Sequence, residues 1–311
     1  MTDSCDTISP CTIPEILEFA SRPAMLPVYC KAFTKGKTRL KAGETLPMLS
    51  AVWRGAGETR ALLKAYREVC KLPAGDTVPM LYPYVMGARM QMTIMASAAF
   101  PISPLGVVHA RNNVLQRRAI GETEKFDLHC AVAGQRVVKQ GLEFYMSTRA
   151  EQDGAVLWEC LSSYLVRGKR FGEPDGPSPV IAALPELEQP NRESAWDVPE
   201  NTGRRYARVT GDYNPIHLCR TLAKLFGFPR HIVHGMWSLA RCTGNLPVPD
   251  PARPFRLDAA FKGPVFLGGR ATMKARSEGE SHRFDLFCAG NDRPVIVGAL
   301  RPATPSETLL G

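Results

Sequence analysis

A degenerate internal duplication is the feature that most constrains how this chain can fold. Val85-Met86-Gly87 precedes an apolar run, and the similar stretch Val233-His234-Gly235 precedes an apolar run of its own. The next glycine landmarks, Gly121 and Gly268, lie 34 and 33 residues beyond the glycines of these stretches. A chain of 311 residues is too long for one small core, so the repeat predicts two structural units of the same kind.

Extended stretches follow both apolar runs. Residues 106–114 and 255–261 alternate in polarity, which indicates strands. Each half then ends in a candidate hairpin, whose arms are residues 142–147 and 155–166 in the first half and 283–288 and 295–300 in the second. An antiparallel sheet needs a cover for its apolar face, and the apolar helix of each half can provide it. The pattern therefore predicts an α+β fold with two similar halves.

Proline marks the boundary between the halves. Residues 172–190 contain five prolines together with glycine and serine, a composition typical of a linker. The sequence thus predicts a first domain over residues 1–171, a linker over residues 172–190 and a second domain over residues 191–311.

Composition indicates a globular protein. Hydrophobic residues make up 44% of the chain and charged residues 22%. The net charge of +9 is spread along the chain without basic blocks, which argues against a nucleic-acid partner. A solvated basic surface is the favoured interpretation, and an anionic ligand such as the phosphates of coenzyme A is the alternative. By charge alone, the candidate phosphate contacts are Arg204, Arg205, Arg256 and Lys262.

The number and spacing of the cysteines indicate the cellular compartment. The nine cysteines are odd in number and form no C-x-x-C pair, which favours reduced thiols in a cytoplasmic protein. The residues Met1–Asp6 show no secretory signal. The most apolar segment, Met80–Phe100, is interrupted by Pro83 and Arg89, so it is expected to be a buried helix and not a membrane span.

The sequence motifs of phosphate-binding loops, metal sites and serine esterases are incomplete or absent. Gly36-Lys37-Thr38 ends like a phosphate-binding loop, but the glycine required five residues earlier is Lys31. The sequence holds neither H-E-x-x-H nor G-x-S-x-G. His231 and His234 have a spacing that could ligate a metal, yet no third ligand stands near them in the sequence. We therefore expect no metal and no cofactor.

The stretch Tyr206–Met236 holds the candidate catalytic residues. Asn214-Pro215 is a favoured helix start, and Gly227 is a favoured stop, so one helix is predicted between them. Asp212 then lies in the turn before this helix and His217 in its first turn. A carboxylate and an imidazole in these places can converge on one water molecule.

Gly235 is a candidate for a second role, which its backbone amide would perform. A helix that begins there directs unpaired amide N–H groups outward from its positive end. Glycine also has no side chain to keep a ligand carbonyl from the backbone. The Gly235 amide is therefore a candidate oxyanion donor.

These residues carry a resemblance to a known family. Thr210-Gly211-Asp212-Tyr213-Asn214-Pro215-Ile216-His217, followed by Ala223, Gly227-Phe228 and His234-Gly235-Met236, resembles the signature of the (R)-specific enoyl-CoA hydratases of the MaoC-like hydratase/dehydratase family. Thr210 stands where serine is common. The match extends over about thirty residues in separate blocks, which makes it far more specific than a single short motif.

The resemblance implies a fold and a reaction. The implied fold is a double hot dog, in which each half is an antiparallel sheet wrapped around a central helix. The implied reaction is the reversible hydration of 2-enoyl thioesters of coenzyme A or acyl carrier protein to (3R)-3-hydroxyacyl thioesters. Asp212 and His217 would hold the water and Gly235 the thioester oxygen. Asn214 would cap the helix with a secondary role at the site, and Thr243 falls where the family often has a hydroxyl near the water.

The two halves are not chemically equal. Asp212 and His217 precede Gly235 by 23 and 18 residues, whereas the first half has only two histidines, His109 and His129, and both follow its helix. The first half therefore cannot hold this dyad. The resemblance to two-domain members of the family implies that such a half gives up its catalytic helix to make room for a long or bulky acyl chain. The methionines at 86, 90, 92 and 95 would suit an adaptable apolar wall, although ordinary core packing is the favoured interpretation.

Two other functions stay open. A hot dog thioesterase would attack the carbonyl carbon, and a non-catalytic acyl-CoA-binding subunit would not react at all. The intact motif around Asp212 and His217 favours the hydratase over both. The chain already mimics a dimer of single hot dog domains, and the sequence gives no signal for or against a further homodimer.

Overall fold

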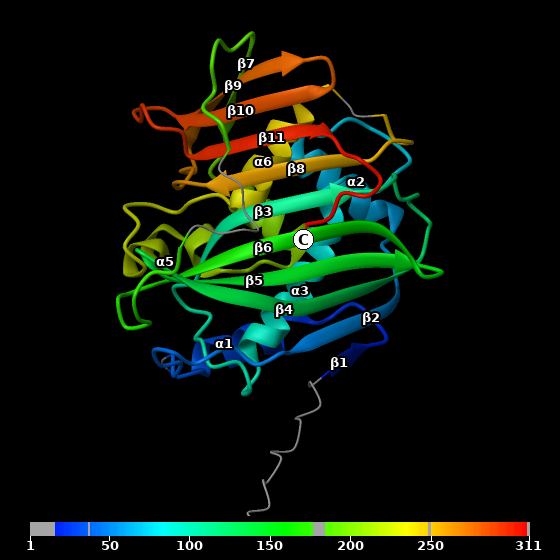
Figure 1. The fold of residues 1–311 in the computed structure, drawn as a ribbon. Helices are drawn as coiled ribbons and strands as arrows, with labels where there is room; N and C mark the ends of the chain where they lie inside the picture. Colours follow the sequence, from blue (N-terminus) through cyan, green and yellow to red (C-terminus); the bar gives the residue numbers. More distant parts are fainter. Residues whose placement is uncertain (1–15, 37, 177–183, 248–249, 310–311) are drawn as a thin grey trace, which may run out of the picture.

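The computed structural model describes residues 16–36, 38–176, 184–247 and 250–309, and one sheet runs through it (Figure 1). Its strand order is β1-β2-β4-β5-β6-β3-β8-β11-β10-β9-β7. All neighbours pair antiparallel except the short parallel pair β1 and β2. The strands are β1 (Ile16–Phe19), β2 (Ser50–Ala56), β3 (Val108–Gln116), β4 (Phe126–Val138), β5 (Gly141–Gln152), β6 (Ala155–Arg167), β7 (Arg192–Val198), β8 (Phe255–Phe261), β9 (Gly269–Glu278), β10 (Ser281–Cys288) and β11 (Ile296–Pro302).

The sheet has two similar halves joined in its middle. β3 pairs with β8 from Arg111 opposite Ala260 to Gln116 opposite Phe255. Outward from this seam the order is β6, β5, β4, β2 on one side and β11, β10, β9, β7 on the other. Both predicted hairpins are present as β5–β6 and β10–β11. The antiparallel α+β architecture expected from the repeat is therefore confirmed.

The helices lie on one face of this sheet, behind it in Figure 1. They are α1 (Met25–Thr34), α2 (Arg60–Cys70), α3 (Tyr82–Ala96), α4 (Thr202–Thr210), α5 (Arg220–Leu225), α6 (Gly235–Gly244) and the 3-10 helix η1 (Pro215–His217). Nearly all of α3 is buried against β2, β4 and β5. At Gly87 a Cβ would lie 2.5 Å from the methyl group of Thr148, so glycine lets the helix approach the sheet closely. The buried helix expected within Met80–Phe100 is thus confirmed.

The predicted helix from Pro215 to Gly227 is wrong in its continuity. The chain makes only the 3-10 turn η1, in which the Leu218 amide donates to the Pro215 carbonyl at 3.1 Å. Cys219 is then extended, with φ −144° and ψ 133°, and α5 begins after it. The His217 side chain is held by the carbonyl of Ile232, which lies on the strand-like segment before α6. This long-range bond redirects the chain after one turn.

Some predictions fall on parts of the chain that the structure does not describe. Residues 177–183 of the predicted linker and the segment Met1–Asp6 lie outside the described residues. The limits of the two domains therefore stay a prediction, as does the cytoplasmic location. The seven cysteines in the described part of the chain are free thiols. Among the helices of that same part, none combines the length and the apolar character needed to cross a membrane.

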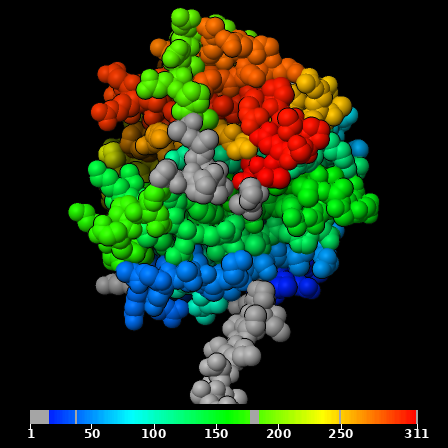
Figure 2. Space-filling model, in the orientation of Figure 1, coloured from blue at the N-terminus to red at the C-terminus, as the bar shows by residue number. Residues whose placement is uncertain are grey.

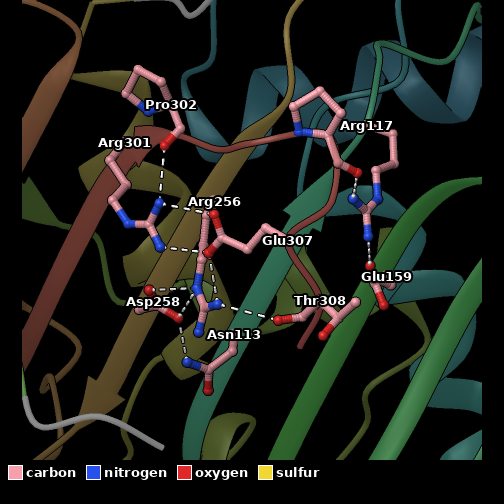
Figure 3. A network of polar contacts seen from close by, with 10 residues as sticks. Asn113, Arg117, Glu159, Arg256, Asp258, Arg301, Pro302, Glu307 and Thr308 are labelled. Carbon is pink, nitrogen blue, oxygen red and sulfur yellow. Dashed lines mark hydrogen bonds and ion pairs between the residues drawn. The ribbon is translucent and has the colours of Figure 1, made fainter. Parts of the chain in front are cut away.

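The outer face of the sheet carries the C-terminal segment. In Figure 2 this segment, in red, lies across the boundary between the halves. Arg256 on β8 donates to Asp258 and Glu307, and Arg301 also donates to Glu307, so the segment is tied to the seam by a polar network (Figure 3). The Arg256 guanidinium is therefore bonded to carboxylates on the outer face, away from the helices. This argues against its prediction as a phosphate contact.

Candidate active site

One cavity of about 910 Å³ brings most of the predicted site residues together. Asp212, Asn214, His217 and Gly235 all line it, and so do residues of α1, α3, β3 and β6 from the first half. Thr243 does not line this cavity, and its hydroxyl donates to the carbonyl of Ala240 at 3.1 Å, within its own helix. The expectation that Thr243 lies near the water is not supported, because the helix directs this side chain elsewhere.

The end of α4 positions Asp212. Gly211 ends this helix with φ 82°, a left-handed conformation that glycine adopts without strain. The Asp212 carboxylate then accepts two hydrogen bonds on Oδ1, from the Tyr29 hydroxyl at 2.7 Å and from the Asn214 amide at 3.2 Å. Its second oxygen, Oδ2, lies 3.7 Å from His234 Nε2. The side chain is 45% exposed, so Oδ2 can meet a ligand in the cavity.

His217 is buried with a defined tautomer. Its Nδ1 lies 2.9 Å from the carbonyl oxygen of Ile232. A carbonyl can only accept, so Nδ1 carries the proton and Nε2 keeps a lone pair. Polar atoms of Asp212, His217 and His234 all lie within 4.8 Å of one another. One water molecule can bridge two such atoms, because each hydrogen bond spans about 2.8 Å.

His234 connects the two parts of the site. Its Nε2 donates to the backbone carbonyl of Asp212 at 3.0 Å, and its ring stacks on His217 with centroids 3.7 Å apart. This bond ties the residue before α6 to the residue that follows α4. Nε2 of His234 and Nδ1 of His217 both carry protons, and the two rings are stacked. The lone pairs of the two rings therefore lie on Nε2 of His217 and Nδ1 of His234.

The charge state of the dyad follows from its surroundings. Burial lowers the pKa of His217 to about 3, assisted by His234 and opposed by Asp212. Burial alone would raise the pKa of the Asp212 carboxyl, but His234, His217 and the Tyr29 hydroxyl outweigh it and hold this pKa below its usual value. At neutral pH the site therefore combines a carboxylate with an uncharged imidazole.

These buried histidines predict how stability depends on pH. The folded-state pKa is about 3 for His217 and about 4 for His109, against 6.5 in the unfolded chain, and burial also lowers the pKa of His234. The unfolded state then binds more protons below pH 6.5, so the free energy of unfolding should fall as the pH decreases from about 6.5 to about 4.5. Carboxyl groups with lowered pKa values, such as Glu124, add their loss only below 4.5. Urea unfolding at about pH 7 and about pH 5 measures the effect, and equal or greater stability at the lower pH would contradict it.

Asn214 and Gly235 take the predicted places. The Asn214 side chain accepts from the Ile216 amide at 3.4 Å and so caps η1. Gly235 is the first residue of α6, and a Cβ there would lie 3.0 Å from the ring of Phe261. The absence of a side chain thus lets the start of α6 lie close to this ring, and both residues line the cavity. Lys262 also lines this cavity, whereas Arg204 and Arg205 do not.

Three residues of the first half reach this site and were not predicted. Tyr29 on α1 bonds to Asp212, and Arg89 on α3 packs against Gly211, where its guanidinium would meet an added Cβ at 2.3 Å. His109 on β3 lines the same cavity. Each contact joins positions more than a hundred residues apart, and no motif in the sequence links them. A polar residue within an apolar helix, as at Arg89, was the one available signal.

Replacing Tyr29 by phenylalanine should lower kcat/KM of the dyad's reaction by roughly 3- to 30-fold. A hydrogen bond to a charged group is worth about 1.5–3 kcal/mol, and part of this orients the carboxylate. Because the Tyr29 hydroxyl helps to lower the pKa of Asp212, its loss should also move the acid limb of the pH–rate profile to higher pH. Tyr213→Phe, which removes a hydroxyl from an exposed neighbour, is the matched control. An unchanged profile in Tyr29→Phe would show that this bond does not tune the site.

Comparisons with known proteins point to one family. Residues 183–293 match the family described as MaoC like domain. The chain is 31% identical to 3-hydroxyacyl-thioester dehydratase X of Mycobacterium tuberculosis over 215 residues, which are 68% of this chain and 75% of that protein. It is 27% identical to enoyl-CoA hydratase ChsH3 of the same organism over 159 residues, which are 50% of this chain and 54% of that protein.

Solved structures agree with the fold. The crystal structure of HtdX of Mycobacterium tuberculosis superposes with a TM-score of 0.69 at 25% identity and covers 82% of this chain and 100% of that one. A MaoC-like dehydratase from Phytophthora capsici superposes with a TM-score of 0.67 at 18% identity, over 84% of this chain and 96% of that one. The predicted α+β hot dog fold is confirmed.

Proposed function

The chain belongs to the MaoC-like dehydratase family and is a hydro-lyase of acyl thioesters, and from this premise we propose that it hydrates 2-enoyl thioesters reversibly to (3R)-3-hydroxyacyl thioesters through Asp212 and His217. The observation that carries the proposal is the pairing of an ionised carboxylate with an uncharged imidazole in one cavity. Atoms of these two groups lie within 4.8 Å, and Gly235 and Met236, the first residues of α6, line the same cavity. The (3R) configuration is what the resemblance to (R)-specific hydratases implies.

In this proposal the thioester carbonyl accepts from the Gly235 amide at the start of α6. Attack of water at the β-carbon moves negative charge onto that oxygen, where the positive end of the helix stabilises it. One such donor is worth about 3–4 kcal/mol of barrier. The water lies between Asp212 Oδ2 and His217 Nε2, because Oδ1 already accepts from Tyr29 and Asn214.

The proposed reaction needs no group that is protonated before the water is bound. His217 Nε2 takes one proton from the water as the hydroxyl group bonds to the β-carbon, and the dyad returns one proton to the α-carbon. The neighbouring carboxylate raises the pKa of His217 and so offsets part of the cost of charging a buried ring. Asp212 and His217 then end the turnover as they began it. In the dehydration direction the same groups take the α-proton and deliver it to the departing hydroxyl.

An assay with 2-enoyl-CoAs of several chain lengths tests the function. The expected result is loss of the enoyl absorbance without release of free thiol. Thiol release without hydration would instead indicate a thioesterase. If neither the enoyl absorbance nor the free thiol changes, and acyl-CoA raises the thermal stability of the protein, the result would indicate a binding subunit. Parallel assays with acyl carrier protein thioesters identify the carrier, and the oligomeric state in solution tests for a homodimer.

A further inference from the structure

The first half contributes a polar cluster to the cavity that the proposed reaction does not use. Tyr84 on α3, His109 on β3 and Tyr164 on β6 line the same cavity as Asp212 and Gly235. The His109 ring stacks on both tyrosines, with centroids 5.5 and 4.9 Å apart. Burial lowers the pKa of His109 to about 4, so the ring is uncharged at neutral pH and offers one donor and one acceptor.

The contacts that the three side chains make with one another, and the contact of His109 with Asn112, are long. The Tyr84 hydroxyl lies 3.4 Å from His109 Nδ1 and 3.5 Å from the Tyr164 hydroxyl. Asn112 Nδ2 lies 3.4 Å from His109 Nε2. Good hydrogen bonds between such atoms measure about 2.7–3.0 Å. The Tyr84 hydroxyl is therefore only weakly satisfied by His109 and Tyr164.

The layer behind the cluster is, by contrast, well bonded. Tyr164 donates to Gln91 Oε1 at 2.5 Å, and Gln91 Nε2 donates to Thr148 at 3.0 Å and to Ser162 at 3.3 Å. Gln91 and Ser162 are fully buried, and Thr148 is nearly so. This network fixes the Tyr164 side chain in place.

Such a wall is poorly suited to a purely hydrocarbon chain. A polar group that loses cavity water without gaining a good partner costs about 1–3 kcal/mol. Ligand sites are mostly apolar and carry a few placed polar groups that fix orientation. A substrate oxygen at this wall would replace the long contacts with short ones, whereas a methylene group would leave them as they are.

The cluster also lies close to where the thioester would sit. The Phe261 ring, 3.0 Å from a Cβ built on Gly235, is 4.9 Å from the His109 ring between centroids. Asn112 Nδ2 lies 3.4 Å from the sulfur of Met236, the residue after Gly235. One aromatic ring thus separates the proposed oxyanion amide from the cluster, a distance that an acyl group in the cavity can span.

We propose that Tyr84, His109 and Tyr164 form a subsite for a neutral oxygen, a hydroxyl or keto group, on the acyl portion of the substrate. The inference rests on the proposed function and names the class of acyl group that the site prefers. Uncharged hydroxyl and imidazole groups are suited to hydrogen-bond a neutral oxygen.

Matched substrates test the subsite. The measurement is kcat/KM for a hydrocarbon 2-enoyl-CoA and for isomers of equal chain length with a hydroxyl group at successive carbons beyond the double bond. In the wild type, one or more isomers should exceed the hydrocarbon substrate by about tenfold, which corresponds to one good hydrogen bond. In Tyr84→Phe and in Tyr164→Phe this ratio should fall towards one. Ser163→Ala, which removes a buried hydroxyl from a neighbouring position of β6, should keep the wild-type ratio.

Each other outcome has a defined meaning. If the wild type hydrates the hydrocarbon substrate as well as every hydroxylated isomer, the inference fails while the proposed function stands. If Tyr84→Phe lowers kcat/KM for all substrates by the same factor, the cluster contacts the carrier arm that they share, and its assignment to the acyl group is wrong. If no substrate is hydrated, the proposed function fails and the inference with it. Thermal unfolding of each variant shows whether it is folded, and the wild-type series decides the question without any variant.

Discussion

Replacement of His217 by alanine is expected to lower kcat/KM for 2-enoyl-CoA hydration by about 10²–10⁴-fold, the range that general acid–base catalysis contributes. The variant keeps the Asp212 carboxylate and the Gly235 amide but loses the lone pair that takes the water proton. Because His217 is uncharged at neutral pH, the loss should not reflect the removal of a positive charge that binds substrate. Asp212→Asn should give a loss of similar size, since asparagine replaces one accepting oxygen by an NH₂ group that can only donate, and it carries no negative charge.

A matched control separates catalysis from folding. His129→Ala removes an imidazole that pairs with Glu151 on the first half of the sheet and does not line the active-site cavity. This control should retain hydration close to the wild type. Far-UV circular dichroism and thermal unfolding show whether His217→Ala is folded. A folded His217→Ala with near-normal hydration would remove His217 from the mechanism.

Replacement of Gly203 by alanine is expected to damage both the fold and the site. A Cβ at this position of α4 would lie 2.0 Å from the carbonyl oxygen of His217, an atom of the backbone that no side-chain rotation can move away. α4 and η1 must separate, which should cost about 1–3 kcal/mol of stability. The same shift misplaces His217 relative to Asp212, and a displacement near 1 Å can cost about 10²-fold in rate.

Gly36 provides the matched control for Gly203→Ala. Gly36 is exposed, and a Cβ there meets no atom within 4 Å. Gly36→Ala should therefore keep the wild-type stability and kcat/KM. Urea unfolding and the hydration assay measure both quantities for the two variants. Equal behaviour of Gly203→Ala and Gly36→Ala would show that the contact between α4 and His217 does not hold the site together.

The motif residues could be predicted because their geometry is mostly local. Asp212, Asn214 and His217 lie close together in the sequence, and the capping preference of Asn214-Pro215 predicts the helical turn that begins there. The Gly235 helix start follows from the same rules. The unequal halves could also be predicted, and the structure explains them. Lys71 ends α2 in the left-handed conformation as Gly211 ends α4, so Leu72 stands where Asp212 stands in the second half.

The rest of the site depends on contacts between distant parts of the chain. Tyr29 and Asp212 are 183 positions apart, and only the packing of α1 beside the second half brings them together. Thr243 was misplaced because its position relative to Gly235 was carried over from the family and not from the direction of its own helix. The continuous helix after Pro215 failed for a related reason, since the bond from His217 to Ile232 overrides local helix propensity.

Hydration in oxygen-18 water tests the central claim most directly. In the proposed mechanism the water held between Asp212 and His217 attacks the β-carbon of the enoyl thioester. The product of crotonyl-CoA should therefore be (3R)-3-hydroxybutyryl-CoA with one oxygen-18 atom at carbon 3 and an intact thioester, and Asp212→Asn should form little of it. Oxygen-18 in the carboxyl group of a free acid, or a (3S) product, would contradict the account.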